Sequence, residues 1–193
     1  MEEVVKTMTA AESLAGKIKD KTARVGVIGL GYVGLPLAME FARAGFHVTG
    51  IDVQESKIDQ LKAGISYVQD VPTETVRKYV DEGRFDSTTD FSVIEQLDTI
   101  NIAVPTPLRK TKDPDMSYVV AASEEVAKYI HPGTLVILES TTYPGTTDEL
   151  LLPMMEKSGL KVGEDFFLCF SPERVDPGNP KYQTVNIPRW SAV

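Results

Sequence analysis

The sequence predicts an α/β fold of the doubly wound kind, in which helices cover both faces of a mostly parallel sheet. Three observations lead to this prediction. Strand-sized apolar runs alternate with helix-length segments along the 193 residues, and a glycine-rich turn joins the first strong run to a helical stretch. Hydrophobic residues make up 42% of the chain and charged residues 25%, close to the average of globular domains. Because parallel strands need a long, usually helical crossover, the alternation predicts a parallel sheet with the strand order 3-2-1-4-5-6.

The first helix is expected near the N-terminus, ahead of the main domain. Thr9 and Glu12 have the spacing of a capping box, and Leu14 and Ile18 lie one turn apart in the stretch that follows. These features predict a short helix over residues 9–19.

A strand, a tight turn and a helix follow in direct succession. The apolar run Val25–Ile28 predicts the strand, the glycines at 29–34 predict the turn, and the apolar periodicity up to Ala44 predicts the helix. Gly45 suits the left-handed position that ends such a helix. The same alternation predicts later strands near residues 46–51, 84–87, 99–104, 134–139 and 166–170, and helical segments near residues 56–62, 73–82, 117–129 and 147–157.

These elements predict one domain over residues 23–175, preceded by an N-terminal extension over residues 1–22. One domain is also what a chain of 193 residues accommodates. Residues 176–193 begin with several prolines and glycines and contain no clear element, so we expect a linker toward a further domain.

Charge and cysteine content exclude several classes of function. The chain has 20 Lys+Arg and 28 Asp+Glu, a net charge of -8 that would repel nucleic acid, and its basic residues form no cluster. No apolar stretch approaches the roughly 20 residues that span a bilayer. The first residues contain Glu2 and Glu3 and lack the apolar run of a secretory signal. Because Cys169 is the single cysteine, no internal disulfide or multi-cysteine zinc site is possible. We expect a cytoplasmic protein with no metal, nucleic-acid or membrane partner.

The turn at residues 29–34 has the G-x-G-x-x-G spacing of dinucleotide-binding sites. The glycine pattern alone also occurs in ordinary loops, which is the alternative interpretation. Here it lies between a buried-type strand and a helix, and Asp52 ends the next strand 18 residues after Gly34. Gly29 permits the tight turn, Gly31 lets the backbone approach a diphosphate, and Gly34 lets the helix pack on the strand. The diphosphate would meet free N–H groups at a helix N-terminus, where the helix dipole favours negative charge. This is the Rossmann arrangement.

Asp52 predicts which dinucleotide the site prefers. Its carboxylate is expected to accept hydrogen bonds from the adenosine ribose hydroxyls. A 2′-phosphate about 4 Å from that carboxylate would cost about 4 kcal/mol per unit charge at an effective dielectric near 20. We therefore expect NAD rather than NADP as the cofactor. The alternative interpretation of Asp52 is a plain helix cap.

Four segments of the chain together resemble the UDP-glucose/GDP-mannose dehydrogenase family. Their order is that of the family, and the resemblance covers about residues 11–189. The forms SYV at 66–68, STTYPG and SPER look most like the UDP-N-acetylglucosamine 6-dehydrogenase branch. The four segments read GLGYVGLP at 29–36, VPTP at 104–107, ESTTYPGTT at 139–147 and FSPERVDPGN at 170–179.

The resemblance implies that the 6-hydroxyl of a UDP-sugar becomes a carboxylate while two NAD molecules are reduced in turn, in a homodimer or higher homo-oligomer. Thr141 matches a threonine that helps to position a catalytic water, and Glu173 matches a glutamate in acid/base work. Glu173 and Arg174 are expected to contact the substrate, although Arg174 suits a surface ion pair with Asp176 equally well. Val33, Asp52, Lys57, Thr106 and Thr141 match positions that hold NAD in the family. Together with the glycine turn, the residues expected to bind the cofactor are Gly29, Gly31, Tyr32, Val33, Gly34, Asp52, Lys57, Val104, Pro105, Thr106, Ser140 and Thr141.

The chain also departs from the family's pattern. The nucleophilic cysteine of the family lies in a later domain, and no segment of these 193 residues matches that region. Cys169 lies inside an apolar run, so we expect a structural thiol rather than a substitute nucleophile. Some members carry a second glutamate four residues after the position of Glu173, where this chain has Pro177 preceded by Asp176, and the sequence leaves open whether Asp176 takes over that role. His47 and His131 have no metal-like or triad-like partner nearby and are expected to be structural or surface residues.

We therefore expect the cofactor-binding half of a nucleotide-sugar dehydrogenase, inactive by itself. Two alternatives stay open on the sequence alone. One is the cofactor half of another NAD dehydrogenase that shares the glycine pattern, and the other is a regulatory NAD-sensing module that performs no chemistry.

Overall fold

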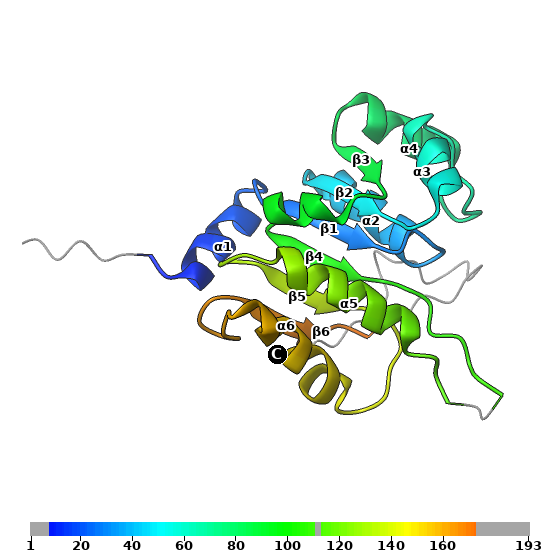
Figure 1. Ribbon diagram of the computed structural model, residues 1–193. Coiled ribbons are helices and arrows are strands. Elements are labelled where there is room, and N and C mark those ends of the chain that lie inside the picture. The colour runs from blue at the N-terminus through cyan, green and yellow to red at the C-terminus, as the bar shows by residue number, and fades with distance from the viewer. Residues whose placement is uncertain (1–7, 111–112, 173–193) are drawn as a thin grey trace, which may run out of the picture.

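The computed structural model describes residues 8–110 and 113–172, and it confirms the predicted architecture. Six strands form one parallel sheet in the order β3-β2-β1-β4-β5-β6, with helices on both faces (Figure 1). The strands are β1 (Arg24–Ile28), β2 (His47–Ile51), β3 (Phe85–Thr88), β4 (Thr99–Ile102), β5 (Leu135–Leu138) and β6 (Phe167–Phe170).

Two apolar clusters hold the helices against the sheet. Val25 and Val27 of β1 belong to the first cluster with α2, α3 and α4, whereas Ile28 of the same strand belongs to the second cluster with η1, α5 and α6. Side chains along a strand alternate between its two faces, so β1 contributes to both clusters. The helical elements are α1 (Ala10–Lys19), α2 (Gly34–Ala44), α3 (Glu55–Lys62), α4 (Thr73–Asp81), η1 (Phe91–Gln96), α5 (Ser117–Tyr129), η2 (Thr146–Leu151), α6 (Leu152–Met155) and η3 (Glu156–Ser158).

The capping geometry of the first helices agrees with the sequence prediction. Thr9 caps α1, and both hydrogen bonds of the capping box with Glu12 are present, at 3.2 and 3.0 Å. Leu14 is buried, whereas Ile18 one turn later is exposed. Gly45 ends α2 with a φ of 102°, a left-handed conformation that favours glycine.

Two helical segments differ from the sequence prediction. The expected helix near residues 147–157 is split into the π-helix η2, the short α6 and the 3-10 turn η3. Pro153 lies at the start of α6 and has no N–H to donate to the preceding turn, which accounts for the interruption. The 3-10 helix η1 is absent from the sequence prediction, although Asp90 caps it by accepting the Ser92 N–H at 2.9 Å.

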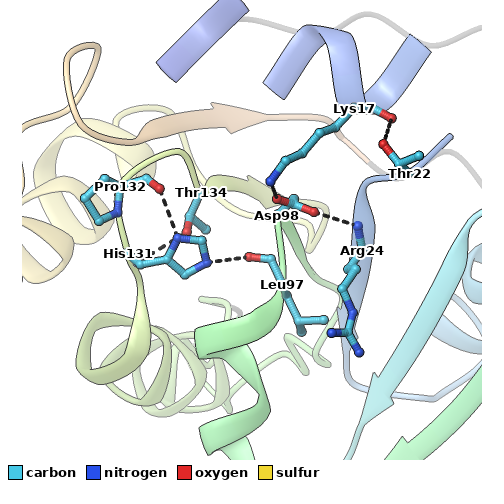
Figure 2. A network of polar contacts seen from close by, with 8 residues as sticks. All are labelled: Lys17, Thr22, Arg24, Leu97, Asp98, His131, Pro132 and Thr134. Atoms are coloured by element: carbon cyan, nitrogen blue, oxygen red, sulfur yellow. Dashed lines mark hydrogen bonds and ion pairs between the residues drawn. The ribbon is translucent and has the colours of Figure 1, made fainter. Parts of the chain in front are cut away.

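A network of polar contacts links several elements at the amino edge of the sheet (Figure 2). Asp98, just before β4, accepts the Lys17 ammonium at 2.6 Å and the Arg24 N–H at 2.8 Å, so it ties α1 and β1 to β4. His131 lies beside it, with Nε2 3.0 Å from the Leu97 carbonyl oxygen. His131 is therefore a structural residue, as expected.

Candidate functional site

The carboxyl edge of the sheet brings the ends of four strands together. In the strand register, Ile28 of β1 lies opposite Ile51 of β2 and Ile102 of β4, and Ile102 lies opposite Leu138 of β5. The residues that follow these strands therefore share one edge. After β1 the chain crosses one face through α2, and after β4 it crosses the other face through α5. In doubly wound folds, ligands bind at this point, where the crossovers diverge.

A cavity of about 170 Å³ lies at this edge. Every predicted cofactor-binding residue lines it except Gly34, which is buried at the start of α2. Ala103 and Glu139 also line the cavity, and sequence reasoning missed both. The full lining is Gly29, Gly31, Tyr32, Val33, Asp52, Lys57, Ala103, Val104, Pro105, Thr106, Glu139, Ser140 and Thr141.

A second hollow, of about 610 Å³, adjoins the first and shares Asp52 and Lys57 with it. Val53, Phe91 and Tyr118 give it apolar surface, and Val53 and Tyr118 are 76% and 50% exposed. Surroundings of this kind suit a flat, apolar ring such as a purine. Sequence reasoning missed these three residues because they come from separate segments and no local motif marks them.

The glycines of the turn are of two kinds: two are required by the fold, and one borders open space. Gly29 has a φ of 89°, and a Cβ there would lie 2.8 Å from the Ala103 carbonyl oxygen. A Cβ on Gly34 would overlap the Gly29 carbonyl oxygen, whereas a Cβ on Gly31 would meet no atom within 4 Å. Gly29 and Gly34 are therefore required by the fold itself. Gly31 borders open space, where a missing side chain leaves room for a ligand.

The N–H groups at the start of α2 are available to that ligand. Among the described residues, those of Gly31, Tyr32 and Val33 donate to no acceptor. The helix begins after Val33, which provides no side-chain cap, and its first turn contains no acidic residue. Unpaired donors at the positive end of a helix dipole favour an anion such as a diphosphate. The turn therefore fits the predicted dinucleotide.

Asp52 follows β2 and is 7% exposed. Its Oδ2 accepts the Leu30 N–H at 2.9 Å and the Lys57 ammonium at 2.9 Å, and its Oδ1 accepts the Gln54 N–H at 3.1 Å. Asp52 does not cap α3, because the N-cap of that helix is Gln54. Lys57 offsets the charge of Asp52, so the penalty for a 2′-phosphate is smaller than an unpaired carboxylate predicts.

The ends of β4 and β5 supply the opposite wall of the cavity. Ser140 is buried, and its hydroxyl donates to the Val104 carbonyl oxygen at 2.7 Å. The Ser140 side chain thus joins the two strand ends, and its proton is already used within the protein. Thr141 is exposed and Thr106 is half-buried, so both hydroxyls are accessible to a ligand. Glu139 lies in the same lining and is 3% exposed.

Cys169 lies on β6 and is half-buried. Burial raises the pKa of its thiol above the ordinary value, and the negative charge of Glu139 raises it further. A thiol that resists ionisation is a weak nucleophile, which agrees with the expected structural role. Glu173, Arg174 and Asp176 lie outside the described residues.

Across residues 8–110 and 113–172, no group of three or more His, Cys, Asp or Glu side chains is placed to hold a metal ion. His47 is exposed, with Nδ1 3.2 Å from the Gly83 carbonyl oxygen. No helix within the same ranges is long and apolar enough to cross a membrane.

Known proteins are similar in sequence to this chain. Residues 23–190 match the UDP-glucose/GDP-mannose dehydrogenase family, NAD binding domain. The chain is 38% identical over 168 residues to the UDP-N-acetyl-D-glucosamine 6-dehydrogenase of Pseudomonas aeruginosa, across 86% of this chain and 39% of that protein. It is 35% identical over 156 residues to the UDP-N-acetyl-D-mannosamine dehydrogenase of Pyrococcus horikoshii, across 80% of this chain and 37% of that protein.

A solved structure shares the fold as well. The NDP-N-acetyl-D-galactosaminuronic acid dehydrogenase of Methanosarcina mazei Go1 superimposes with a TM-score of 0.77 at 39% identity, across 88% of this chain and 38% of that chain. The chain thus spans well under half the length of each of these relatives.

Proposed function

Because this chain belongs to the UDP-glucose/GDP-mannose dehydrogenase family as its NAD-binding domain, we propose that it serves the oxidation of a UDP-N-acetylhexosamine. In the proposed reaction, the 6-hydroxyl of the sugar becomes a carboxylate while two NAD molecules are reduced in turn. UDP-N-acetylglucosamine is the proposed substrate. Its support is the 38% identity to a UDP-N-acetyl-D-glucosamine 6-dehydrogenase, together with the SYV, STTYPG and SPER forms of the sequence.

The observation that carries the proposal is the cavity at the carboxyl edge that is lined by every predicted cofactor residue except Gly34. We assign the diphosphate of NAD to the unpaired N–H groups of Gly31, Tyr32 and Val33, and the adenosine ribose to Asp52. The adenine is assigned to the adjoining hollow of about 610 Å³. This leaves the wall formed by the ends of β4 and β5 for the nicotinamide, which supplies the hydride acceptor when NAD is bound.

Three residues carry the proposed contacts with the substrate and the catalytic water. Thr141 is exposed at the end of the cavity assigned to the nicotinamide, where its hydroxyl is free to hold a water. Glu173 is proposed as the acid/base and, with Arg174, as a substrate contact, on the basis of the matching SPER segment. We further propose a cytoplasmic homo-oligomer as the working form of the complete enzyme.

Calorimetry of the 193-residue chain with NAD tests the first half of the proposal. We expect one NAD to bind per chain, and folded protein that releases or takes up no heat with NAD would contradict the assignment. NADH absorbance in a mixture of the chain, NAD and UDP-N-acetylglucosamine tests the second half. No steady NADH production is expected, because the family places its nucleophilic cysteine in a region that does not match these residues.

The substrate is tested in the complete enzyme with a panel of UDP-N-acetylglucosamine, UDP-N-acetylmannosamine and UDP-glucose. UDP-N-acetylglucosamine should give the highest kcat/KM, and a preference for either other sugar would overturn that choice. NAD binding without turnover of any nucleotide sugar by the complete enzyme would instead favour a regulatory NAD-sensing module.

A further inference from the structure

Tyr67 lies in the loop between α3 and α4, outside the residues that line the cavity. Its ring is half-buried against the cluster of α2, α3 and α4. Its hydroxyl donates to the Leu30 carbonyl oxygen at 2.7 Å, across 37 residues of sequence. Leu30 is the second residue of the glycine turn. The Tyr67 side chain, from a loop distant in sequence, is therefore hydrogen-bonded to the backbone of the proposed diphosphate site.

The peptide that Tyr67 holds is the one that presents a donor to the cavity. The Leu30 carbonyl and the Gly31 N–H belong to the same peptide group. Because a trans peptide is planar, the two bonds point in opposite directions, and fixing the carbonyl fixes the N–H. The preceding peptide is fixed as well, since the Leu30 N–H donates to Asp52 at 2.9 Å. Both peptides of Leu30 are therefore anchored before any ligand arrives.

We propose that Tyr67 is a positioning residue for NAD, which aims the Gly31 N–H at the diphosphate by holding the Leu30 carbonyl. The inference rests on the proposed function, because it concerns the same cofactor site. The Tyr67 hydrogen bond favours NAD binding by preorganisation, because the turn then loses little conformational entropy when the diphosphate binds.

Lys57, on α3, contacts both Asp52 and Tyr67. Its ammonium lies 2.9 Å from Asp52 Oδ2 and 5.9 Å from the centre of the Tyr67 ring. Burial raises the pKa of the Tyr67 hydroxyl, and the Asp52 charge raises it further, so the hydroxyl stays protonated and able to donate at neutral pH. The ribose-binding carboxylate and the diphosphate-binding turn are thus held by one set of contacts.

Tyr67→Phe tests the proposal, because it removes the hydroxyl and keeps the buried ring. NAD and ADP should bind about fivefold to tenfold more weakly, the size of one hydrogen bond, while adenosine, which lacks the diphosphate, should bind unchanged. Tyr79→Phe is the matched control. Tyr79 is 5% exposed in the same cluster, and its loss of a hydroxyl should leave all three affinities unchanged.

The outcomes separate the two proposals. If the wild-type chain does not bind NAD, the proposed function fails. If the wild type binds NAD and Tyr67→Phe binds it equally well, or loses NAD and adenosine affinity together, the inference about Tyr67 fails. Amide hydrogen exchange gives the second measurement: Tyr67→Phe should speed exchange in the turn at residues 29–34 and leave the strands unchanged. A uniform increase across the sheet would show a purely structural role.

Discussion

Two buried aspartates lie at opposite edges of the sheet with nearly the same partners. Asp52 at the carboxyl edge is 7% exposed, and Asp98 at the amino edge is 8% exposed. Each accepts a lysine ammonium, at 2.9 Å from Lys57 and 2.6 Å from Lys17. Each also accepts a backbone N–H from a residue at one end of β1 or just beyond it, at 2.9 and 2.8 Å.

The surroundings of the two pairs differ. Asp52 lines both cavities and lies beside a turn with unpaired N–H groups. Asp98 lies among α1, β1 and the His131 loop, where its partners tie elements together (Figure 2). A buried carboxylate–lysine pair is thus not a binding site by itself. The space and the unpaired N–H donors around Asp52 distinguish it from Asp98.

The largest effect is expected inside the glycine turn. Gly34→Ala should destabilise the domain by about 3 kcal/mol or more, because its Cβ would overlap the Gly29 carbonyl oxygen. Gly31→Ala should leave the melting temperature unchanged, since its Cβ meets no atom within 4 Å, yet weaken NAD binding by occupying the ligand's space. Thermal melts and calorimetry check both variants. A stable Gly34→Ala protein, or a Gly31→Ala protein with normal NAD affinity, would contradict this interpretation of the turn.

Replacing each aspartate by alanine should affect NAD binding at the carboxyl edge only. Asp52→Ala should weaken NAD binding by roughly tenfold or more, the contribution of hydrogen bonds to a charged group. Asp98→Ala should leave NAD affinity unchanged and lower the free energy of unfolding by about 1–3 kcal/mol, because the Arg24 N–H loses its acceptor. The Lys17 ion pair adds little to that loss, since its side chain is 49% exposed. Equal losses of NAD affinity in both variants would contradict the proposal that Asp52 binds NAD and Asp98 does not.

Lys57 should set the size of the preference for NAD over NADP. With the Asp52–Lys57 pair intact, we expect a preference of roughly tenfold to a hundredfold, below the value for an unpaired carboxylate. Lys57→Met should weaken NADP binding more than NAD binding, because Asp52 then repels the 2′-phosphate without an opposing charge. Competition titrations with both dinucleotides measure the ratio, and an unchanged ratio in Lys57→Met would show that the pair does not control it.

The smallest effect concerns Cys169. Because the pKa of its thiol is raised in the folded state, iodoacetamide at neutral pH should modify the folded chain more slowly than the urea-unfolded chain. Because ionisation of this thiol is less favourable in the folded state than in the unfolded state, the free energy of unfolding should be unaffected by the thiol at neutral pH and should decline as the pH rises above its ordinary pKa. Cys169→Ala is the control for both measurements. Faster modification of the folded chain than of the unfolded chain would contradict a structural role for the Cys169 thiol.

The sequence predicted the parts of the site that local patterns encode. The strand order follows from alternating elements, and the glycine turn and Asp52 follow from spacing along one strand–helix–strand unit. Tyr67, Phe91 and Tyr118 were not predicted as site residues, because only the folded chain brings their segments next to the turn. The Asp52–Lys57 contact likewise needed the structure, and it reduced the predicted discrimination against NADP.

In the proposed complex, the diphosphate of NAD binds the unpaired N–H groups at the start of α2. Titrating ¹⁵N-labelled chain with NAD tests it most directly through the backbone amide resonances. We predict the largest shifts at Gly31, Tyr32 and Val33, with no shift at the amino edge for Arg24 and Asp98. Saturable NAD binding that leaves the amide resonances of these three residues unshifted, or that shifts the resonances of Arg24 and Asp98 instead, would contradict this assignment.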